Sequence, residues 1–387
     1  MRVLLVQTLA WGGIAQYAYQ LARALAGSRC QVILLAPPDY ELASRMPARI
    51  SALRFLPRLI PCASLARRLS AKPLRWFVIG LSSIIDAHRL LNISFTLKPA
   101  VIHIQGGHPM DIVYLLAARL VRVPVIYTAH NVLPHRPAPH HRLVHRLLYS
   151  LPDHIICHTQ DARAQLLTLF RLQPRRVGVI PMPLFDLFDP GDRPSPDAAR
   201  AALGLKPDQK VVLFFGQIRP NKGLPALLRA VAQVRQSQPD AVLLIAGEPL
   251  GDLRPALSMI NHLGLRSAVW LRPGYVPLEQ VPTYFQAADV VALPYARTTQ
   301  SAVLALALAF DKAVVASRVG GLPELAQYSD LACLVPPDDE KALAQAILSR
   351  LDNPPRPPVQ WHGLRWPVAA RLTAALYCEA LAARPQN

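Results

Sequence analysis

The chain has 387 residues, of which 52% are hydrophobic and 17% charged, a composition that excludes a disordered protein and allows two domains with separate cores. Residues 1–195 hold 23 Lys and Arg against 9 Asp and Glu, and residues 196–387 hold 19 against 15, so the first half carries most of the net charge of +18. Such an excess of positive charge suits a phosphorylated substrate, an anionic membrane face or nucleic acid. The sequence has no ribonucleoprotein motif and no zinc-finger spacing, so we expect no nucleic-acid partner.

Cysteine usage and the N-terminus indicate the compartment. Five cysteines without a CxxC pair predict buried thiols in a reducing environment. The apolar run in MRVLLVQ is too short for a signal peptide and is typical of a first strand. No stretch reaches about 18 uninterrupted apolar residues, so no helix is expected to span a bilayer. We therefore expect a cytoplasmic protein with peripheral contact at the inner membrane face.

The chain opens with a strand, a helix and a second strand. The pattern predicts a strand over 2–7, a helix from Ile14 to near Gly27 and a strand over 31–36. Gly12 and Gly13 stand at the start of this helix, as in a doubly wound fold. The full GxGxxG is absent, so a dinucleotide site is not supported, and a tight turn explains the glycine pair equally well.

Residues 54–97 form an unusual basic and apolar segment. Arginines and Lys72 are interleaved with Leu, Ile, Trp76 and Phe77. One interpretation is an amphipathic surface that lies on anionic lipid headgroups. The other is a pair of ordinary helices covering the core, interrupted at Pro73.

The rest of the first half continues the alternation. Strands are predicted at 100–106, 124–130, 153–160 and 176–183, with helices near 110–120 and over 162–170. His130 ends one of these strands, a place that faces a ligand cleft, where it can act as an acid, a base or a hydrogen-bond donor. The histidines at 135, 140, 141 and 145 are expected in a proline-broken basic loop, and without acidic neighbours they predict no metal site.

Residues 184–209 are rich in Pro and Asp and indicate a linker with one short helix. The second half then repeats the alternation. Strands are predicted at 211–215, 241–246, 268–271, 289–293, 313–317 and 331–336, with helices at 224–236, 252–263, 278–287, 301–310 and 368–383.

The stretch VVLFFGQIRPNKG, residues 211–223, carries the strongest chemical signal. A buried strand stops at Gly216, and Arg219 and Lys222 follow three residues apart, before a helix that starts after Gly223. The carboxyl end of a parallel strand is where such a fold holds an anionic ligand. A planar guanidinium and a compact ammonium suit two linked phosphates, whereas the alternative is a solvated basic turn.

Several stretches together resemble one family. They are GQIRPNKG, LLIAGEP, LPYARTTQSAVLALALAFDKAVVASRVGGLPEL and LVPPDD in the second half, with GGIAQYAYQLARAL, VIYTAHNVLPH and VIPMPLFD in the first. The chain thereby resembles retaining GT-B glycosyltransferases of the family 4 type. The resemblance implies an α/β fold of two Rossmann-like, doubly wound domains facing across a cleft. It places an acceptor-side domain at 1–190 and a sugar-nucleotide domain at 191–367, with the helix 368–387 packing back on the first.

The resemblance also implies roles for single residues. Arg219 and Lys222 would bind the donor diphosphate and stabilise its charge as it departs, and His130 would lie near the reacting sugar. The remaining donor-binding positions would be Gly12, Gly13, Gly216, Glu248, Thr298, Thr299, Gln300, Ser301, Ala302, Val303 and Glu324. Among them, the backbone amides of 299–303 would hold the distal phosphate at a helix N-terminus.

The sequence departs from the family at two positions, because Thr298 and Leu306 stand where two glutamates are usual. The base and the sugar of the donor therefore stay open. The implied reaction moves a sugar from a nucleoside-diphosphate sugar to an acceptor hydroxyl with retention, without a metal or other cofactor, in cell-surface polysaccharide or glycolipid synthesis. A lipid-linked or anionic glycan acceptor fits the basic first half. The alternatives are a GT-B-like sugar-nucleotide epimerase or hydrolase, and a catalytically weakened binding subunit.

Overall fold

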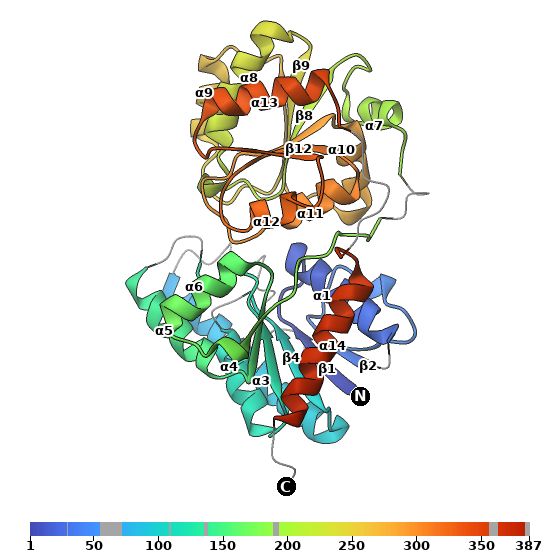
Figure 1. The fold of residues 1–387 in the computed structure, drawn as a ribbon, viewed down its shortest axis with the longest axis vertical. Helices are drawn as coiled ribbons and strands as arrows, with labels where there is room; N and C mark the ends of the chain where they lie inside the picture. Colours follow the sequence, from blue (N-terminus) through green and yellow to red (C-terminus); the bar gives the residue numbers. More distant parts are fainter. Residues whose placement is uncertain are drawn as a thin grey trace. The chain divides into compact units, whose positions relative to one another are not determined.

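A computed structural model describes residues 1–28, 30–54, 72–107, 110–134, 138–188, 193–355 and 363–383. The chain divides into two compact units, which are shown in Figure 1. Unit 1 comprises Met1–Pro181 and Gly363–Asn387, and unit 2 comprises Met182–His362. Each unit is built on one parallel β-sheet with helices packed against it.

The sheet of unit 1 has the strand order β3-β2-β1-β4-β5-β6-β7, and all its pairs are parallel. Its strands are β1 (Arg2–Gln7), β2 (Gln31–Ala36), β3 (Ser51–Arg54), β4 (Val101–Gln105), β5 (Val125–Thr128), β6 (His154–Cys157) and β7 (Val177–Val179). Its α-helices are α1 (Gly13–Ala26), α3 (Lys72–Leu97), α4 (Asp111–Leu120), α5 (Pro139–Ser150), α6 (Gln160–Phe170) and α14 (Trp366–Ala382). The order reverses between β1 and β4, which is the switch point where such sheets bind ligands.

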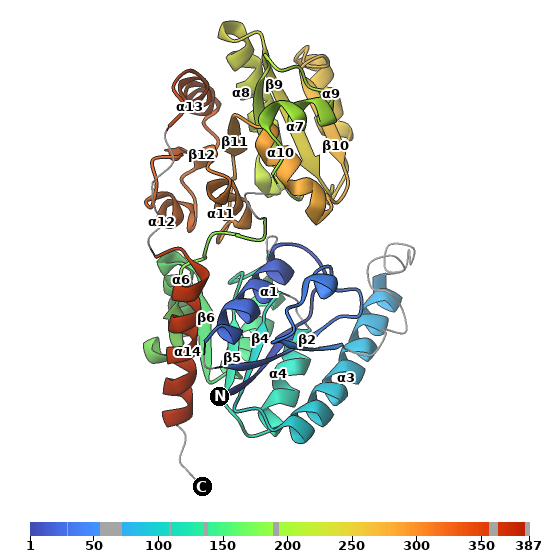
Figure 2. The ribbon, with the colours of Figure 1, turned by 90° about the vertical axis from the view of Figure 1, so that its right-hand side faces the viewer.

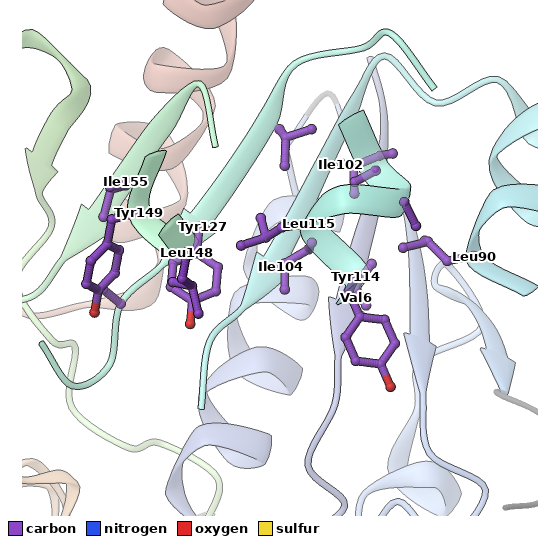
Figure 3. Packing of buried hydrophobic residues seen from close by; sticks show 14 of the residues in the cluster. Val6, Leu90, Ile102, Ile104, Tyr114, Leu115, Tyr127, Leu148, Tyr149 and Ile155 are labelled. Carbon is purple, nitrogen blue, oxygen red and sulfur yellow. The ribbon is translucent and has the colours of Figure 1, made fainter. Parts of the chain in front are cut away.

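Apolar strands and the helices that cover them form the core of unit 1. Ile102 and Ile104 of β4 are fully buried, as expected of a central parallel strand, and Leu115 of α4 packs in the same cluster. Figure 3 shows these side chains beside Tyr127 and Tyr149, whose rings lie 6.1 Å apart at an angle of 68°. Edge-to-face aromatic pairs of this kind add to the free energy gained by burial.

The C-terminal helix α14 belongs to unit 1. It lies beside α1, as Figure 2 shows. Its Tyr377 is fully buried, and the hydroxyl lies 2.6 Å from Nδ1 of His103 in the central strand β4. Trp366, in the first turn of α14, stacks edge-on against Tyr17 of α1 with 5.1 Å between ring centroids. The end of the chain therefore completes the core of the first unit.

Unit 2 repeats the design with the strand order β10-β9-β8-β11-β12-β13 and a switch point between β8 and β11. Its strands are β8 (Lys210–Phe215), β9 (Ala241–Gly247), β10 (Val269–Pro273), β11 (Val290–Leu293), β12 (Ala313–Ser317) and β13 (Ala332–Val335). Its α-helices are α7 (Pro196–Leu203), α8 (Leu224–Ser237), α9 (Arg254–His262), α10 (Val281–Ala287), α11 (Ala302–Ala309), α12 (Leu322–Ala326) and α13 (Glu340–Asp352). The core joins β8, β9, β11 and β12 to the apolar faces of α8 and α13.

The structure corrects the prediction of a loop around the clustered histidines. His140, His141 and His145 lie on the helix α5, which begins at Pro139. Proline is compatible with the first helical turn, where its missing N–H has no partner inside the helix, so it starts this helix rather than breaking it. His135 lies outside the described residues.

Other differences concern elements that the sequence pattern did not predict. The structure adds the edge strand β3 and the helices α12 and α13. In the basic segment, α3 begins at Lys72, so Pro73 lies in its first turn, where proline is tolerated. The predicted helix before Pro73 falls outside the described residues. Residues 55–71, which are part of the predicted lipid-facing segment 54–97, lie outside the described residues. The prediction of buried cysteines is wrong for Cys378, which is exposed.

Within the described ranges, no helix is both long enough and apolar enough to cross a membrane.

Candidate functional site

The loop that follows β8 brings both predicted cations to the carboxyl edge of the sheet in unit 2. Gly216 ends the strand with a φ of 96°, a left-handed backbone that suits glycine. Arg219 precedes a short 3₁₀ turn, Pro220–Lys222, and Gly223 then caps the start of α8. The side chain of Arg219 donates to Oε1 of Gln217, which fixes its guanidinium within the loop.

The loop after β11 interlocks with the loop after β8. The ammonium of Lys222 lies 3.6 Å from the ring centroid of Tyr295, a cation–π contact with an almost fully buried ring. Asn221 is held by Ala296, whose N–H donates to its carbonyl at 3.0 Å. Gly223 has a φ of 70°, and a Cβ there would lie 1.7 Å from the carbonyl oxygen of Pro294. Only glycine lets the two loops approach this closely.

The N-terminus of α11 completes this edge. Ser301 is the N-cap, and its Oγ accepts from the N–H of Leu304 at 3.2 Å. Helix geometry leaves the N–H groups of Ala302 and Val303 without an acceptor inside the helix. The position of a Cβ on Gly216 lies 3.3 Å from Val303, so β8 ends directly against this first turn.

The turn before α11 is held by its own hydrogen bonds and by the next loop. Thr298 donates from Oγ1 to the carbonyl of Gln300 at 2.6 Å. The N–H of Gly321 donates to the carbonyl of Thr299 at 3.1 Å. Gly320, with a φ of 51°, has no room for a Cβ, which would lie 1.8 Å from the carbonyl oxygen of Thr298. The predicted segment 298–303 is therefore a turn that packs closely against Gly320 and ends at a helix N-terminus.

Two cations lie at this edge of the sheet. In the part of the chain that the structure describes, neither Arg219 nor Lys222 forms an ion pair with a carboxylate. Burial lowers the pKa of the Arg219 guanidinium, although it stays charged near neutral pH. Its Nε is buried and has no hydrogen-bond partner among the described residues. Two cations after β8 and a helix N-terminus after the neighbouring β11 thus lie at one edge of the sheet, an arrangement suited to a polyvalent anion.

The two predicted glutamates lie at neighbouring strand ends. Glu248 directly follows β9, and its carbonyl accepts from the N–H of Ile218 at 2.9 Å, which ties it to the loop of Arg219. Glu324 is in the first turn of α12, three residues after Gly321. Leu306, where a glutamate is usual in the resembled family, is buried on α11.

In unit 1, the predicted glycine pair lies at the start of α1, but a carboxylate is already present there. Gly12 is the N-cap, with a φ of 84°, and Gly13 is the first helical residue. The N–H of Gly12 donates to Oε1 of Glu41 at 2.8 Å, and Gln16 approaches the same oxygen at 3.4 Å. The carboxylate of Glu41 therefore supplies the negative charge that interacts favourably with the N-terminal end of the α1 dipole.

His130 lies at the carboxyl end of β5, as predicted, but it is only 2% exposed. Its Nε2 lies 3.0 Å from Oε1 of Gln105, and its Nδ1 lies 3.3 Å from Nε2 of His158. Tyr17 of α1 packs edge-on against both rings, with centroids 5.0 Å and 4.9 Å away. The structure thus places both ring nitrogens of His130 within hydrogen-bonding distance of protein groups.

Burial keeps this group of histidines neutral. It lowers the pKa of His103 from 6.5 to about 3 and that of His158 to about 4. The pKa of His130 is also lowered well below 6.5, first by burial and then by the neighbouring His158 and His103. At neutral pH, each ring therefore carries one proton and one lone pair.

The sequence patterns did not predict roles for Gln105, His158, Tyr17, Glu41 and Tyr295. Gln105 and His158 had a detectable signal, because each is a polar residue at the end of a buried strand, as His130 is. Tyr295 and Glu41 act through contacts between loops, which no local pattern reveals. Among the residues described, no group of three or more His, Cys, Asp and Glu could hold a metal ion.

Comparisons with known proteins match both halves of the chain. Residues 11–184 match the family model described as Glycosyltransferase Family 4, and residues 209–353 match that described as Glycosyl transferases group 1. The D-inositol 3-phosphate glycosyltransferase of Segniliparus rotundus is 36% identical over 216 residues, which are 52% of this chain and 47% of that protein. The chain therefore spans about half the length of the curated relatives it matches.

Solved structures share the fold over the whole chain. The sucrose-phosphate synthase of Thermosynechococcus elongatus has a TM-score of 0.75 at 20% identity and covers 99% of this chain and 100% of its own. Anabaena HepE, solved in complex with UDP and glucose, has a TM-score of 0.70 at 19% identity and covers 99% of this chain and 97% of its own. At these identities the likeness concerns the fold, which is the GT-B fold.

Proposed function

Because the chain belongs to the family 4 type of GT-B glycosyltransferases, we propose that it transfers a sugar from a nucleoside-diphosphate sugar to an acceptor hydroxyl, with retention of the anomeric configuration. The observation that supports this most is the edge of unit 2, which carries Arg219, Lys222 and the first turn of α11, with neither cation in an ion pair among the described residues. These groups match the charge and the hydrogen-bonding capacity of a diphosphate.

In the proposed reaction, the diphosphate is the leaving group. It gains negative charge as the bond to the anomeric carbon breaks, and the oxygen that departs must be stabilised. Arg219 and Lys222 are held by Gln217 and Tyr295, so they reorganise little as that charge develops. The N–H groups of Ala302 and Val303 add oriented donors and the dipole of α11. We propose that these groups supply the charge stabilisation that a divalent cation provides in other transferases, so that no metal or other cofactor is needed.

The donor screen is the first test. Binding of UDP, GDP, ADP and dTDP to the full chain is measured by thermal shift, followed by the matching sugar nucleotides with and without an acceptor. HepE was solved with UDP and glucose, so UDP and UDP-glucose head the screen. Transfer of label from a sugar nucleotide to an added acceptor supports the proposal. Release of free sugar or an epimerised nucleotide without any acceptor supports the hydrolase or epimerase alternative, and failure to bind any nucleoside diphosphate contradicts donor binding.

The acceptor is proposed from charge. Residues 1–195 hold the larger share of the basic charge, which favours an anionic acceptor, either a phosphorylated polyol or a lipid-linked glycan. The relatives named D-inositol 3-phosphate glycosyltransferase make a phosphorylated polyol the first acceptor to try. A synthetic role in cell-surface polysaccharide or glycolipid formation follows if a lipid-linked acceptor is used.

We also propose contact with an anionic membrane surface, which is supported by one helix of unit 1. Leu143 and Leu147 of α5 are 74% and 52% exposed, and Arg142 and Arg146, also exposed, flank them. The helix contains no acidic residue. Exposed leucines beside arginines suit the boundary between anionic headgroups and acyl chains.

Vesicle co-sedimentation tests this contact. The full chain should bind vesicles that contain phosphatidylglycerol at low salt, but not vesicles of phosphatidylcholine alone. Leu143→Glu should weaken binding by about tenfold or more, since it replaces an apolar contact with a like charge. Leu257→Glu, at a leucine of unit 2 that is 44% exposed, is the matched control. Equal binding by the two variants, or no binding by the unaltered chain, contradicts the proposal.

A further inference from the structure

A continuous row of buried polar groups runs through unit 1, from α14 to the carbonyl of Ile180. The hydroxyl of Tyr377 lies 2.6 Å from Nδ1 of His103. The other ring nitrogen of His103, Nε2, lies 3.1 Å from the amide nitrogen of Gln105 and 2.7 Å from Oγ1 of Thr128. The amide oxygen of Gln105 lies 3.0 Å from Nε2 of His130. Nδ1 of His130 lies 3.3 Å from Nε2 of His158, whose Nδ1 lies 2.9 Å from the carbonyl oxygen of Ile180.

The carbonyl of Ile180 sets the direction of this row, because a carbonyl can only accept. Nδ1 of His158 must therefore carry its proton, and the Nε2 of this neutral ring holds a lone pair. It follows that His130 donates to His158 from Nδ1 and has its own lone pair on Nε2. His130 is thereby assigned to the Nδ1–H tautomer.

The other half of the row accommodates this tautomer when the amide of Gln105 is turned. The two ends of a glutamine amide have the same shape, and their assignment follows from hydrogen bonding. With its NH₂ toward His130, Gln105 donates to Nε2 of that ring and turns its oxygen to Nε2–H of His103. Nδ1 of His103 then accepts from the hydroxyl of Tyr377. The Nε2–H of His103 is shared between the amide oxygen of Gln105 and Oγ1 of Thr128, and every other contact in the row joins one donor to one acceptor.

The opposite orientation of Gln105 would need one more proton. If its oxygen faces Nε2 of His130, that atom must carry hydrogen, and the two rings of His130 and His158 would share three protons and a positive charge. Burial opposes this charge, as the lowered pKa values of both rings indicate. Near neutral pH, the uncharged row with one direction is the favoured arrangement.

We propose that His158 is a positioning residue that holds His130 in the Nδ1–H tautomer, so that His130 meets a substrate hydroxyl as a hydrogen-bond acceptor through Nε2. A hydroxyl that reaches Nε2 takes the place of the amide hydrogen of Gln105. The part concerning the substrate rests on the proposed glycosyl transfer, whereas the tautomer does not. The two parts can therefore fail separately.

Nitrogen NMR of the full chain, labelled with ¹⁵N-histidine, tests the tautomer directly. The signals of His130 are assigned by their loss in His130→Gln, and near neutral pH they should show the Nδ1–H form. His158→Leu removes the acceptor, so His130 should change to the Nε2–H form and donate to the oxygen of Gln105. His158→Gln offers an amide oxygen in its place and should restore the Nδ1–H form. His88→Gln, at an exposed histidine of α3, should change nothing at His130.

The outcomes decide the proposal even if one variant does not fold. An Nε2–H form or an imidazolium at His130 in the unaltered chain overturns it. So does an unchanged tautomer in a folded His158→Leu variant. If His158→Leu does not fold, the unaltered chain and His158→Gln suffice, since both must show the Nδ1–H form.

Kinetics test the link to the substrate once a donor and an acceptor are known. His158→Leu should lower kcat by about 10-fold to 100-fold, as for partners that orient metal-binding histidines. The KM for the donor should stay within about twofold, because the diphosphate site is in unit 2 under the proposal, and His158→Gln should recover most of kcat. A raised KM with unchanged kcat overturns the acceptor role. If no transfer is found with any substrate, the proposed function fails while the tautomer result stands.

Discussion

The two units share a fold but differ in the charged and polar groups at the carboxyl edge of their sheets. In unit 2, Arg219 and Lys222 stand beside a helix N-terminus, without a carboxylate partner among the described residues. In unit 1, Glu41 lies at the N-terminus of α1, and the histidines at the strand ends bond to one another. The same topology can therefore leave cations unpaired at its edge or satisfy the polar groups there internally.

Two helix N-termini make this difference specific. The side-chain cap that the described residues give the first turn of α11 is the hydroxyl of Ser301, and Arg219 and Lys222 follow the neighbouring strand β8. The first turn of α1 has the carboxylate of Glu41 on Gly12. A phosphate that approached Gly12 would meet a like charge, whereas one that approached Ala302 would meet positive charge. These charges favour unit 2 as the proposed site of the diphosphate.

Removing the guanidinium of unit 2 should have the largest effect. Arg219→Ala should lower kcat by about 10²–10³-fold, since one oriented donor to a developing charge is lost. Arg219→Lys keeps the charge but not the planar fork, so it should recover only part of the loss. Steady-state kinetics with the donor found by the screen measure both. A change below about threefold in Arg219→Ala would mean that the diphosphate lies elsewhere.

The interlock of the two loops should be the next most sensitive feature. Gly223→Ala combines a left-handed backbone with a Cβ that would lie 1.7 Å from the carbonyl oxygen of Pro294, so we expect a loss of about 3 kcal/mol in the unfolding free energy. Gly204→Ala is the matched control, because its φ of 74° is similar and nothing lies within 4 Å of its Cβ. It should cost about 1 kcal/mol. Urea denaturation measures both, and equal losses would contradict a close approach of the loops.

Acid should weaken unit 1 more than unit 2, because the buried histidines belong to unit 1. The pKa of His158 is 6.5 when unfolded and about 4 when folded, so its contribution to stability is complete above pH 6.5 and is lost as the pH falls toward 4. Between about pH 6.5 and pH 5, one such histidine costs about 2 kcal/mol.

Hydrogen exchange, corrected for the intrinsic pH dependence, separates the units. Protection of the amides in β4 and β5 should decrease on acidification more than that in β8 and β9. The variant His158→Gln, which cannot take up this proton, should show a shallower decrease in unit 1. Parallel decreases in both units would show that the histidine row is not the cause.

The smallest expected effect concerns the aromatic support of Lys222. Tyr295→Leu removes the ring beneath the ammonium and should weaken nucleoside diphosphate binding by about 5-fold to 30-fold, which corresponds to about 1–2 kcal/mol. Tyr295→Phe keeps the ring and loses only the contact of the hydroxyl with Ser301, which is 3.4 Å long, so its affinity should stay within about twofold. Calorimetry compares the two variants, and equal affinities would show that the cation–π contact does not contribute to binding.

Much of the fold could be predicted because parallel sheets place apolar runs between polar loops. The strand of Val211 to Phe215 and the helix that starts at Gly13 are examples in which local pattern and burial agree. The helix α13 was detectable as well, since Asp339 is an N-cap before Leu343 and Ile347 on one face. The pattern does not predict the helix α5, because Pro134, Pro137 and Pro139 interrupt it, although the last of them starts the helix.

The candidate site could be predicted only in part, for a physical reason. Arg219 and Lys222 are signalled by their place after a buried strand, which is local information. The partners that fix their geometry come from other loops, as Tyr295 does. His103 and Tyr377 are 274 residues apart in sequence and meet only through folding of α14 onto unit 1. Sequence patterns thus reveal which groups carry charge, but not which groups hold them.

The most direct test compares a nucleoside diphosphate with its monophosphate. Calorimetry of the full chain should give an affinity for the diphosphate, UDP if the screen selects uridine, at least about tenfold higher than for the monophosphate, because the second phosphate meets Arg219, Lys222 and the N-terminus of α11. In the double variant Arg219→Ala and Lys222→Ala, this ratio should fall to about one, while the monophosphate affinity changes little. An unchanged ratio in the folded double variant would contradict the assignment of the diphosphate to unit 2.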